Sequence, residues 1–487
     1  MVTLGAEKKT HRPATVAALL LALFMGAMEM TVISTAMPTV VAELGGALHY
    51  AWVFTAYMLT STVTVPIYGK LADLHGRKPV MLIAMALFLI GSMASGQART
   101  MGQLIAFRAV QGIGAGGMQP MALTIVGDIF KIEERAKMQG VFGTVWAVAG
   151  LVGPLLGGVI VATLSWRWVF YVNVPFGLLS AVVLTFSLVE TVEKRQHGLD
   201  IAGALLLSGA VIALLLGTDG ELPWLLLPVS VILTVAFIMV EARVKEPILP
   251  LQLFAQRILA TSSMLSAFGG GAMVGLVTFV PLYAQGVLGS TPTEAGTTIA
   301  ALAVTWPFAS AISGRLIVKV GFRPLVRVGF FLVAAATVAL TVAMSHGASA
   351  MTVRLAAAMF GIGMGLANTP VVIAVQTSVG FSQRGVATAS TMFFRNIGGT
   401  VAVGVMGVVL ARALLAGAAR QAGGADLVAR ILGPERRNVD AGVLASISGD
   451  LALGLTQVMW LVSALAIGAA IAAWFFPDVS TTDAPER

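Results

Sequence analysis

The sequence predicts an all-α membrane protein with fourteen transmembrane helices. Hydrophobic residues make up 57% of the chain and charged residues only 11%. The mean hydropathy of +0.92 lies far above that of soluble globular proteins. The apolar residues fall into runs of roughly 20, the length that crosses the hydrocarbon core as a helix. The 54 glycines suit helices that pack closely within a bilayer.

Fourteen apolar runs are the candidate spans, and short polar segments separate most of them. They lie at 14–37, 50–69, 79–96, 101–123, 138–162, 169–188, 201–217, 223–241, 258–284, 295–314, 325–344, 351–376, 385–411 and 451–476. The run at 201–217 is short, but the brief polar loop after it favours a hairpin of two spans over a re-entrant segment. An even number of spans places both termini on one side of the membrane.

The positions of Lys and Arg predict the orientation of these spans. Most of the 30 Lys and Arg fall in segments that are cytoplasmic if the N-terminus is inside. Much of the remainder lies in one long loop, 412–450, and long loops carry less weight in this rule. Arg108 and Arg395 lie within spans. We therefore expect cytoplasmic termini, and we interpret the net charge of +8 as a topology signal rather than a nucleic-acid-binding patch.

Two pairs of segments repeat along the chain. Gly69–Pro79 follows the second span and shares Gly, a basic residue, Leu, Gly and Pro with Gly314–Pro324, 245 residues later. The glycines of Gly112–Gly117 in the fourth span are matched by Gly361–Leu366 in the twelfth. Repeated halves are common in secondary transporters, which bind substrate between them. The repeats predict an N-terminal six-helix half, two inserted helices with linkers, and a C-terminal six-helix half, at 1–188, 189–244 and 245–487.

One carboxylate lies well inside a span. Glu29 belongs to the first apolar run, and no other acidic residue is placed comparably deep. An ionisable residue in a span is a functional-site hypothesis because its burial is costly without a cavity or a partner. Arg108, about seven residues into the fourth span, lies at a compatible depth, so the two form a candidate proton-coupling pair. The alternatives are a structural acid with one fixed partner, and an Arg108 that snorkels to the outer surface.

At these residues the chain resembles the major facilitator superfamily and, within it, the fourteen-span drug:proton antiporters. Gly69–Pro79 is similar to the superfamily's loop 2–3 signature, and Arg108–Gly116 to its helix 4 signature. Gly150–Gly158 is similar to a signature of exporters. Ser165–Gly177 looks like the segment that leads into helix 6 of the fourteen-span group. Glu29–Pro38 resembles that group's helix 1 signature, in which the acid is usually Asp.

The loop after the second span is a candidate conformational latch. Two glycines permit a tight turn there, Asp73 can cap a neighbouring helix, and Arg77 can reach Asp128. The resemblance implies that this loop holds the two halves together on the cytoplasmic side in the outward-open state, with Arg384 as the partner from the other half. The alternative is a solvated loop that only sets topology. The candidate latch residues are Gly69, Asp73, Gly76, Arg77, Lys78, Asp128 and Arg384.

The fifth span carries a stripe of small residues. Gly150, Pro154 and Gly158 are spaced by four, as are Gly153 and Gly157, so they present flat faces for close packing. Pro154 removes one helix hydrogen bond and favours a bend. We interpret this stripe as an antiporter hinge and seal where the fifth span meets the second half. Ordinary glycine-rich packing is the alternative.

Aromatic and polar residues within the spans are candidate walls of a substrate cavity. Cavities with aromatic and methionine side chains suit bulky apolar cations, and the chain has 23 methionines. For each candidate, plain helix packing is the alternative. The candidates are Tyr57, Trp146, Trp306, Asn368, Gln376 and Phe394.

Enzyme classes fit this sequence poorly. The five histidines lie in loops or tails without metal-ligand spacing, and the chain has no cysteine. No Gly-x4-Gly-Lys-Ser/Thr motif is present for ATP hydrolysis. We therefore expect neither a metal nor a cofactor, and a proton gradient as the energy source.

The sequence and the resemblance together predict a proton-coupled secondary transporter that exports lipophilic or cationic drugs by alternating access. We expect a monomer in the lipid bilayer of the cell (cytoplasmic) membrane, with a small-molecule substrate and protons as its partners and no nucleic acid. Two alternatives stay open. One is an exporter of a specific endogenous compound such as a lipid, siderophore or antibiotic, and the other is a non-transporting membrane sensor.

Overall fold

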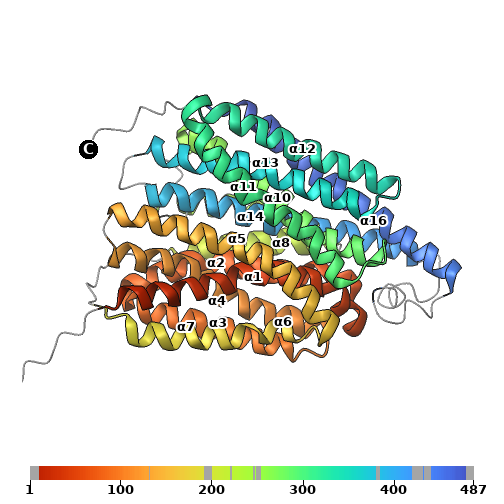
Figure 1. Ribbon diagram of the computed structural model, residues 1–487, viewed down its shortest axis with the longest axis horizontal. Helices are drawn as coiled ribbons and strands as arrows, with labels where there is room; N and C mark the ends of the chain where they lie inside the picture. The colour runs from red at the N-terminus through yellow and green to blue at the C-terminus, as the bar shows by residue number, and fades with distance from the viewer. Residues whose placement is uncertain are drawn as a thin grey trace, which may run out of the picture.

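The computed structural model describes residues 10–130, 132–190, 200–219, 222–244, 247, 254–379, 384–418, 432 and 440–478. Within these ranges the chain is helical without strands, and the long helices run side by side in one bundle (Figure 1). A short 3-10 turn, η1, covers Ala47–His49. The helices are α1 (Arg12–Leu44), α2 (Tyr50–His75), α3 (Arg77–Gly96), α4 (Met101–Ile129), α5 (Ile132–Thr163), α6 (Trp168–Tyr171), α7 (Asn173–Ser187), α8 (Ile201–Asp219), α9 (Pro223–Glu241), α10 (Arg257–Gly286), α11 (Pro292–Val320), α12 (Phe322–Ser345), α13 (Ala350–Ser378), α14 (Arg384–Ala418) and α16 (Ala441–Trp474).

Eleven helical segments in the described part of the chain are long and apolar enough to cross a membrane. One of them joins α6 and α7, which only Val172 separates. Neither α2 nor α4 is among the eleven, and α8 contributes a shorter apolar stretch, Ala202–Leu214. The described helices overlap every predicted apolar run. The number of fourteen spans nevertheless stays a prediction.

Several helices extend beyond the predicted span boundaries. α2 continues through Gly69 and ends at His75. Gly76 alone therefore forms the turn before α3, with φ at 94°. This backbone conformation favours glycine. The prediction that Gly69 also helps to form the turn was wrong, because Gly69 is helical. The predicted outside loop 412–450 is shorter at both ends, since α14 runs to Ala418 and α16 begins at Ala441.

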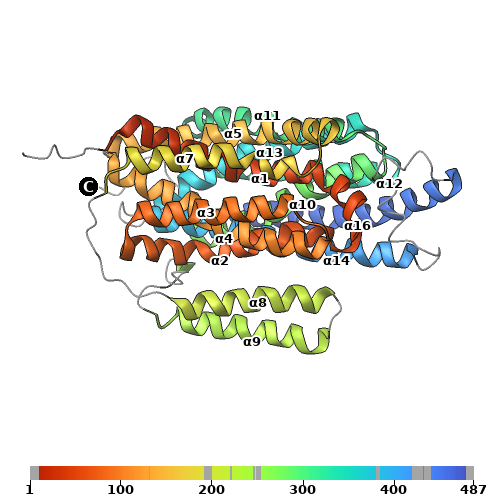
Figure 2. The ribbon, with the colours of Figure 1, turned by 90° about the horizontal axis from the view of Figure 1, so that it is seen from below.

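The helices fall into groups that follow the order of the chain. Figure 1 shows α1 to α7 together in the lower part of the view, and α10 to α14 with α16 in the upper part. Figure 2 shows α8 and α9 as a separate hairpin along one side of the bundle. A small apolar cluster packs α8 on α2 and α14: Trp52, Leu59, Val63, Leu207, Val211, Ile397 and Val401.

The packing of α2 on α4 is repeated in the packing of α11 on α13. Thr60 Oγ1 in α2 donates to the carbonyl oxygen of Ala109 in α4 at 2.8 Å. Thr305, 245 residues after Thr60, makes the same bond from α11 to Ala358 in α13 at 2.9 Å. Glycines allow the close approach, because a Cβ at these positions would overlap the adjoining helix. Gly112 and Gly116 of α4 pack against α2, and Gly361 and Gly365 of α13 pack against α11.

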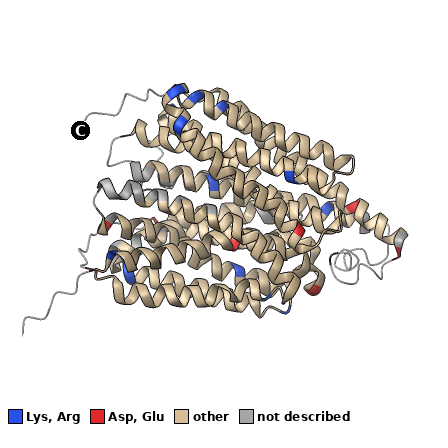
Figure 3. Cartoon of the chain, viewed as in Figure 1, with Lys and Arg blue, Asp and Glu red and all other residues tan. Residues whose placement is uncertain are grey.

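Charged residues are concentrated at the ends of the bundle. Figure 3 shows Lys and Arg gathered at the end where α1 begins, with few charged residues along the middle of the helices. α16 ends at the same end of the bundle (Figures 1 and 2). The apolar middle fits a hydrocarbon slab, so each charge that remains there needs a local explanation.

Candidate functional site

Glu29 and Arg108 form an ion pair inside the bundle. Arg108 Nη1 donates to Glu29 Oε1 at 2.5 Å, and the two side chains are 0% and 1% exposed. α1 and α4 bring these residues together from positions 79 apart in the sequence. Arg108 therefore points inward and does not snorkel to the surface. The pairing that depth alone predicted is present, and its role in proton coupling stays a prediction.

Buried polar side chains surround the ion pair. Arg108 Nη1 also donates to Gln111 Oε1 at 2.7 Å, and Asn173 Nδ2 donates to Glu29 Oε2 at 2.7 Å. Ser92 Oγ accepts hydrogen bonds from both amides, at 3.2 Å from Gln111 Nε2 and 3.0 Å from Asn173 Nδ2. Each carboxylate oxygen therefore has a hydrogen-bond donor, which is what an ionised carboxylate needs in a dry interior.

α2 holds the remaining part of the Arg108 guanidinium. The Cζ atom of Arg108 lies 4.1 Å from the centre of the Tyr57 ring, and Arg108 Nε donates to the carbonyl oxygen of Val53 at 3.3 Å. Its Nη2 is buried and has no hydrogen-bond partner within the described residues. Tyr57, a predicted cavity wall, thus packs on the ion pair as a cation–π partner.

Sequence reasoning missed Ser92, Gln111 and Asn173. Gln111 lies three residues after Arg108, so the helical period already placed it on the same face of α4. Asn173 lies in the Ser165–Gly177 segment, whose resemblance to the fourteen-span group assigns no role to this side chain. Nothing in the sequence of α3 distinguished Ser92 from its other small residues.

The described contacts of the predicted latch segment lie within the N-terminal part of the chain, up to Glu190. Arg77 Nε lies 3.1 Å from Asp128 Oδ2, which confirms the predicted contact. The backbone N–H groups of Arg77 and Lys78 donate to the two carboxylate oxygens of Glu190, at 2.5 and 2.9 Å. A carboxylate is favourable at this helix N-terminus because the helix dipole is positive there. Sequence reasoning missed Glu190.

Lys78 binds α7 and the chain just after it. Its Nζ donates to the carbonyl oxygens of Thr185 at 2.6 Å and Leu188 at 2.8 Å, near the C-terminus of α7, where a cation is favourable. The side chains of Asp73 and Arg384 lie outside the described residues. The predicted contact of the latch with the second half therefore stays a prediction.

The small-residue stripe of α5 divides into two packing faces. A Cβ at Gly157 would lie 2.8 Å from the carbonyl oxygen of Val32 in α1. A Cβ at Gly158 would lie 2.8 Å from the carbonyl oxygen of Pro292 in α11. One face of the stripe therefore packs on α1 and the other lies where α5 meets α11, and its hinge role stays a prediction. Its other members divide in the same way, with Gly153 against α1 and Gly150 and Pro154 against α11.

The six predicted cavity residues have different surroundings. Gln376 Nε2 donates to Thr388 Oγ1 of α14 at 3.2 Å. The Phe394 ring packs edge-on against Phe254, with 5.3 Å between the ring centroids. Trp146 is 39% exposed on α5. Trp306 and Asn368 are half-buried on α11 and α13. Tyr57 packs its ring on Arg108 of the ion pair.

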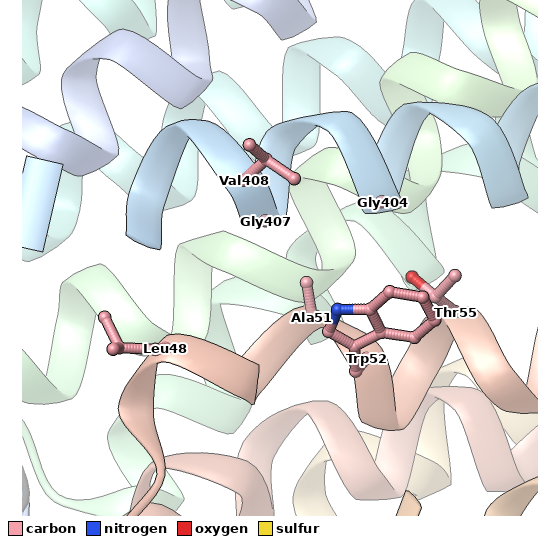
Figure 4. Close-up of a pocket in the computed structure, with 7 residues that line it drawn as sticks. All are labelled: Leu48, Ala51, Trp52, Thr55, Gly404, Gly407 and Val408. Carbon is pink, nitrogen blue, oxygen red and sulfur yellow. The ribbon is translucent and has the colours of Figure 1, made fainter. Parts of the chain in front are cut away.

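A pocket lies between α2 and α14, where the two groups of helices meet (Figure 4). None of the six predicted cavity residues lines it. Thr55 Oγ1 is buried at this pocket without a hydrogen-bond partner in the described part of the chain. The lining residues are Leu48, Ala51, Trp52, Thr55, Gly404, Gly407 and Val408.

Arg395 is the second arginine within a predicted span. It is half-buried in α14, where its backbone packs on Gly270 of α10. Within the described residues its guanidinium has no hydrogen bond or ion pair. The described residues contain no group of three or more His, Cys, Asp or Glu that could hold a metal ion. The candidate functional site inside the described bundle is therefore the Glu29–Arg108 network.

The sequence matches the family model of the Major Facilitator Superfamily over residues 19–403. It is 38% identical over 412 residues to multidrug transporter protein MdtP of Bacillus subtilis, covering 83% of this chain and 76% of that protein. Multidrug resistance protein 3 of the same organism is 35% identical over 412 residues, covering 82% and 80%. Efflux pump FUS6 of Gibberella moniliformis is 32% identical over 410 residues, covering 80% and 73%.

Solved structures share the fold. A bacterial homologue of the human lysosomal transporter Spinster, in an inward-facing and unoccupied conformation, has a TM-score of 0.71 at 16% identity, covering 98% of this chain and 100% of that one. A D-xylose–proton symporter has a TM-score of 0.63 at 15% identity, covering 96% and 97%. These low identities show the fold alone. With the family match, the chain belongs to the Major Facilitator Superfamily and is a multi-pass membrane transporter rather than an enzyme.

Proposed function

We propose that this protein is a drug:proton antiporter of the fourteen-span group that exports lipophilic or cationic compounds by alternating access. The observation that carries the proposal is the buried Glu29–Arg108 pair, because a carboxylate inside the bundle can hold or release a proton there. Relatives named as multidrug transporters and an efflux pump support drug export as the activity.

The coupling follows from competition for one carboxylate. Ionised Glu29 is stabilised by Arg108 and Asn173. A cationic substrate that binds nearby favours the ionised carboxylate and expels the proton, whereas protonation removes the negative charge and weakens binding of the cation. Linkage requires these effects to be reciprocal, so the proton and the cation each lower the affinity for the other. This competition is the thermodynamic requirement for antiport.

In the proposed topology both termini are cytoplasmic, because Lys and Arg gather at the end of the bundle where α1 begins and α16 ends (Figures 1 and 3). In this topology, two buried hydrogen bonds near the outer side join α1 and α2 to α10. Tyr50 Oη donates to the carbonyl oxygen of Thr278 at 2.8 Å, and Gln285 Nε2 donates to that of Thr35 at 2.9 Å. These bonds would break when the outer side opens, as alternating access requires.

Flux through the purified protein tests this function. Proteoliposomes with an acidic interior are given ethidium outside. Protein molecules inserted with their cytoplasmic side outward should carry ethidium into the vesicles, against the ethidium concentration gradient. A protonophore should stop this accumulation. Uptake that continues after the pH gradient collapses would contradict proton coupling. Transport of one compound from a broad panel would favour an exporter of a specific endogenous compound, and no flux of any compound would favour a sensor.

A further inference from the structure

Asn173 is a buried amide whose donor and acceptor are used unequally. Its Nδ2 donates to Glu29 Oε2 at 2.7 Å and to Ser92 Oγ at 3.0 Å, so both amide hydrogens are engaged. Its Oδ1 is buried and has no hydrogen-bond partner in the described part of the chain. A buried unpaired acceptor beside a carboxylate is unusual, because such groups normally find a partner.

Every described hydrogen bond to Glu29 comes from a donor, as the ionised carboxylate requires. A protonated carboxyl needs an acceptor for its O–H, and on the Oε1 side it meets Arg108 Nη1, which can only donate. Gln111 Oε1 accepts one hydrogen bond, from Arg108 Nη1, and makes no described contact with a Glu29 oxygen as an acceptor. Ser92 Oγ accepts from two amides and donates to the carbonyl oxygen of Phe170 at 2.9 Å, which uses the full capacity of a hydroxyl.

We propose that Asn173 is a positioning residue that serves both protonation states of Glu29. It donates from Nδ2 to the ionised carboxylate, and its side-chain amide rotates by half a turn to accept the carboxyl O–H at Oδ1 when Glu29 is protonated. This inference rests on the proposed function, in which Glu29 gains and loses a proton. The described titratable groups that act on Glu29 are Arg108 from α4 and Tyr57 from α2. Arg108 can only donate, and Tyr57 makes no described hydrogen bond to Glu29.

Infrared difference spectra of the purified full-length protein between high and low pH test the rotation. Side-chain amide isotope labelling of asparagine identifies the relevant band, and the other asparagines are Asn368, Asn396 and Asn438. The wild type should show a label-sensitive amide change that follows the carboxyl band of Glu29. Asn173→Leu and Glu29→Gln should each abolish that change, and the control Asn396→Leu should retain it.

The two bands separate the two claims. A Glu29 carboxyl band that titrates without any label-sensitive amide change would overturn the rotation and leave the proposed function standing. A carboxyl band that does not titrate at all would overturn both.

Substrate-induced proton release gives a second readout. Asn173→Leu removes a charge-assisted hydrogen bond from the ionised form and only a neutral one from the protonated form, so Glu29 should keep its proton to higher pH. The pH of half-maximal release should rise by about one unit. Asn173→Gln keeps an amide and should restore part of this shift. A purely structural role predicts a lower melting temperature for both variants with an unchanged pH profile, and that result would contradict the proposal.

Discussion

The two arginines within the helices differ in how their charges are held. Arg108 in α4 is 0% exposed and is held by an ion pair, a side-chain amide, a backbone carbonyl and an aromatic ring. Arg395 in α14 is half-buried and has no such partner within the described residues. Removing one partner of a buried ion pair leaves an uncompensated charge and lowers stability strongly. Removing a charge that has no partner leaves no such charge behind, so the loss of stability is small. The difference supports the proposal that the Glu29–Arg108 pair, between α1 and α4, couples the proton.

The largest expected effect comes from Arg108→Met, which leaves the Glu29 carboxylate buried without its counter-charge. Breaking one side of a buried pair typically destabilises a protein by about 3–5 kcal/mol. The melting temperature in detergent should fall most at alkaline pH, where Glu29 cannot escape the penalty by protonation. Adding Glu29→Gln should restore part of the loss. Equal melting temperatures for wild type and Arg108→Met at alkaline pH would remove the contrast between the two arginines.

The next largest effect tests the contact between the two groups of helices. A Cβ at Gly158 would lie 2.6 Å from Thr293 Cα in α11, whereas a Cβ at Gly150 would lie 3.4 Å from Ala303 Cβ. Gly158→Ala should therefore destabilise the protein by about 1–3 kcal/mol through overpacking and reduce transport. Gly150→Ala is the matched control on the same face of α5 and should be tolerated. The close packing of α5 on α11 is contradicted if the two variants melt and transport alike.

The latch residues should change transport more than binding. Arg77→Ala and Asp128→Asn each break the contact at 3.1 Å, so they should shift the balance of conformations in the same direction. Transport by each variant should fall about fivefold or more, while its affinity for substrate is retained. Flux and equilibrium binding measured on the same preparations separate these effects. Normal transport by Arg77→Ala would reduce the segment to a topology signal.

The smallest effect is expected for Arg395→Met. No described partner is left uncompensated by this change, so the loss of stability should stay below about 1 kcal/mol. The measurement is the melting temperature under the conditions used for Arg108→Met. A loss as large as that of Arg108→Met would show that Arg395 is held as tightly as Arg108.

Local pattern predicted the helices and the Glu29–Arg108 pairing, because apolar run length and depth along a helix can be read from the sequence. The contacts of Asn173 and Glu190 join residues 144 and 113 apart, so they depend on how α7 packs on α1 and α3. Gly69 was misplaced because packing within the bundle overrides the low helix propensity of glycine. The surroundings of the candidate cavity walls could not be read from the sequence, because an aromatic residue in a span gives no sign of which neighbour it faces, as the exposed Trp146 and the buried Tyr57 illustrate. Their role in a substrate cavity stays a prediction.

The central claim is that Glu29 is the group that exchanges the proton for substrate. The most direct test adds a cationic substrate to detergent-solubilised protein and records the protons released, for wild type and Glu29→Gln. The wild type should release protons and bind the cation more tightly as the pH rises. Glu29→Gln should release none and should lose this pH dependence, because its side chain cannot ionise, whereas Glu29→Asp should keep part of the activity. Equal proton release from wild type and Glu29→Gln would contradict the account.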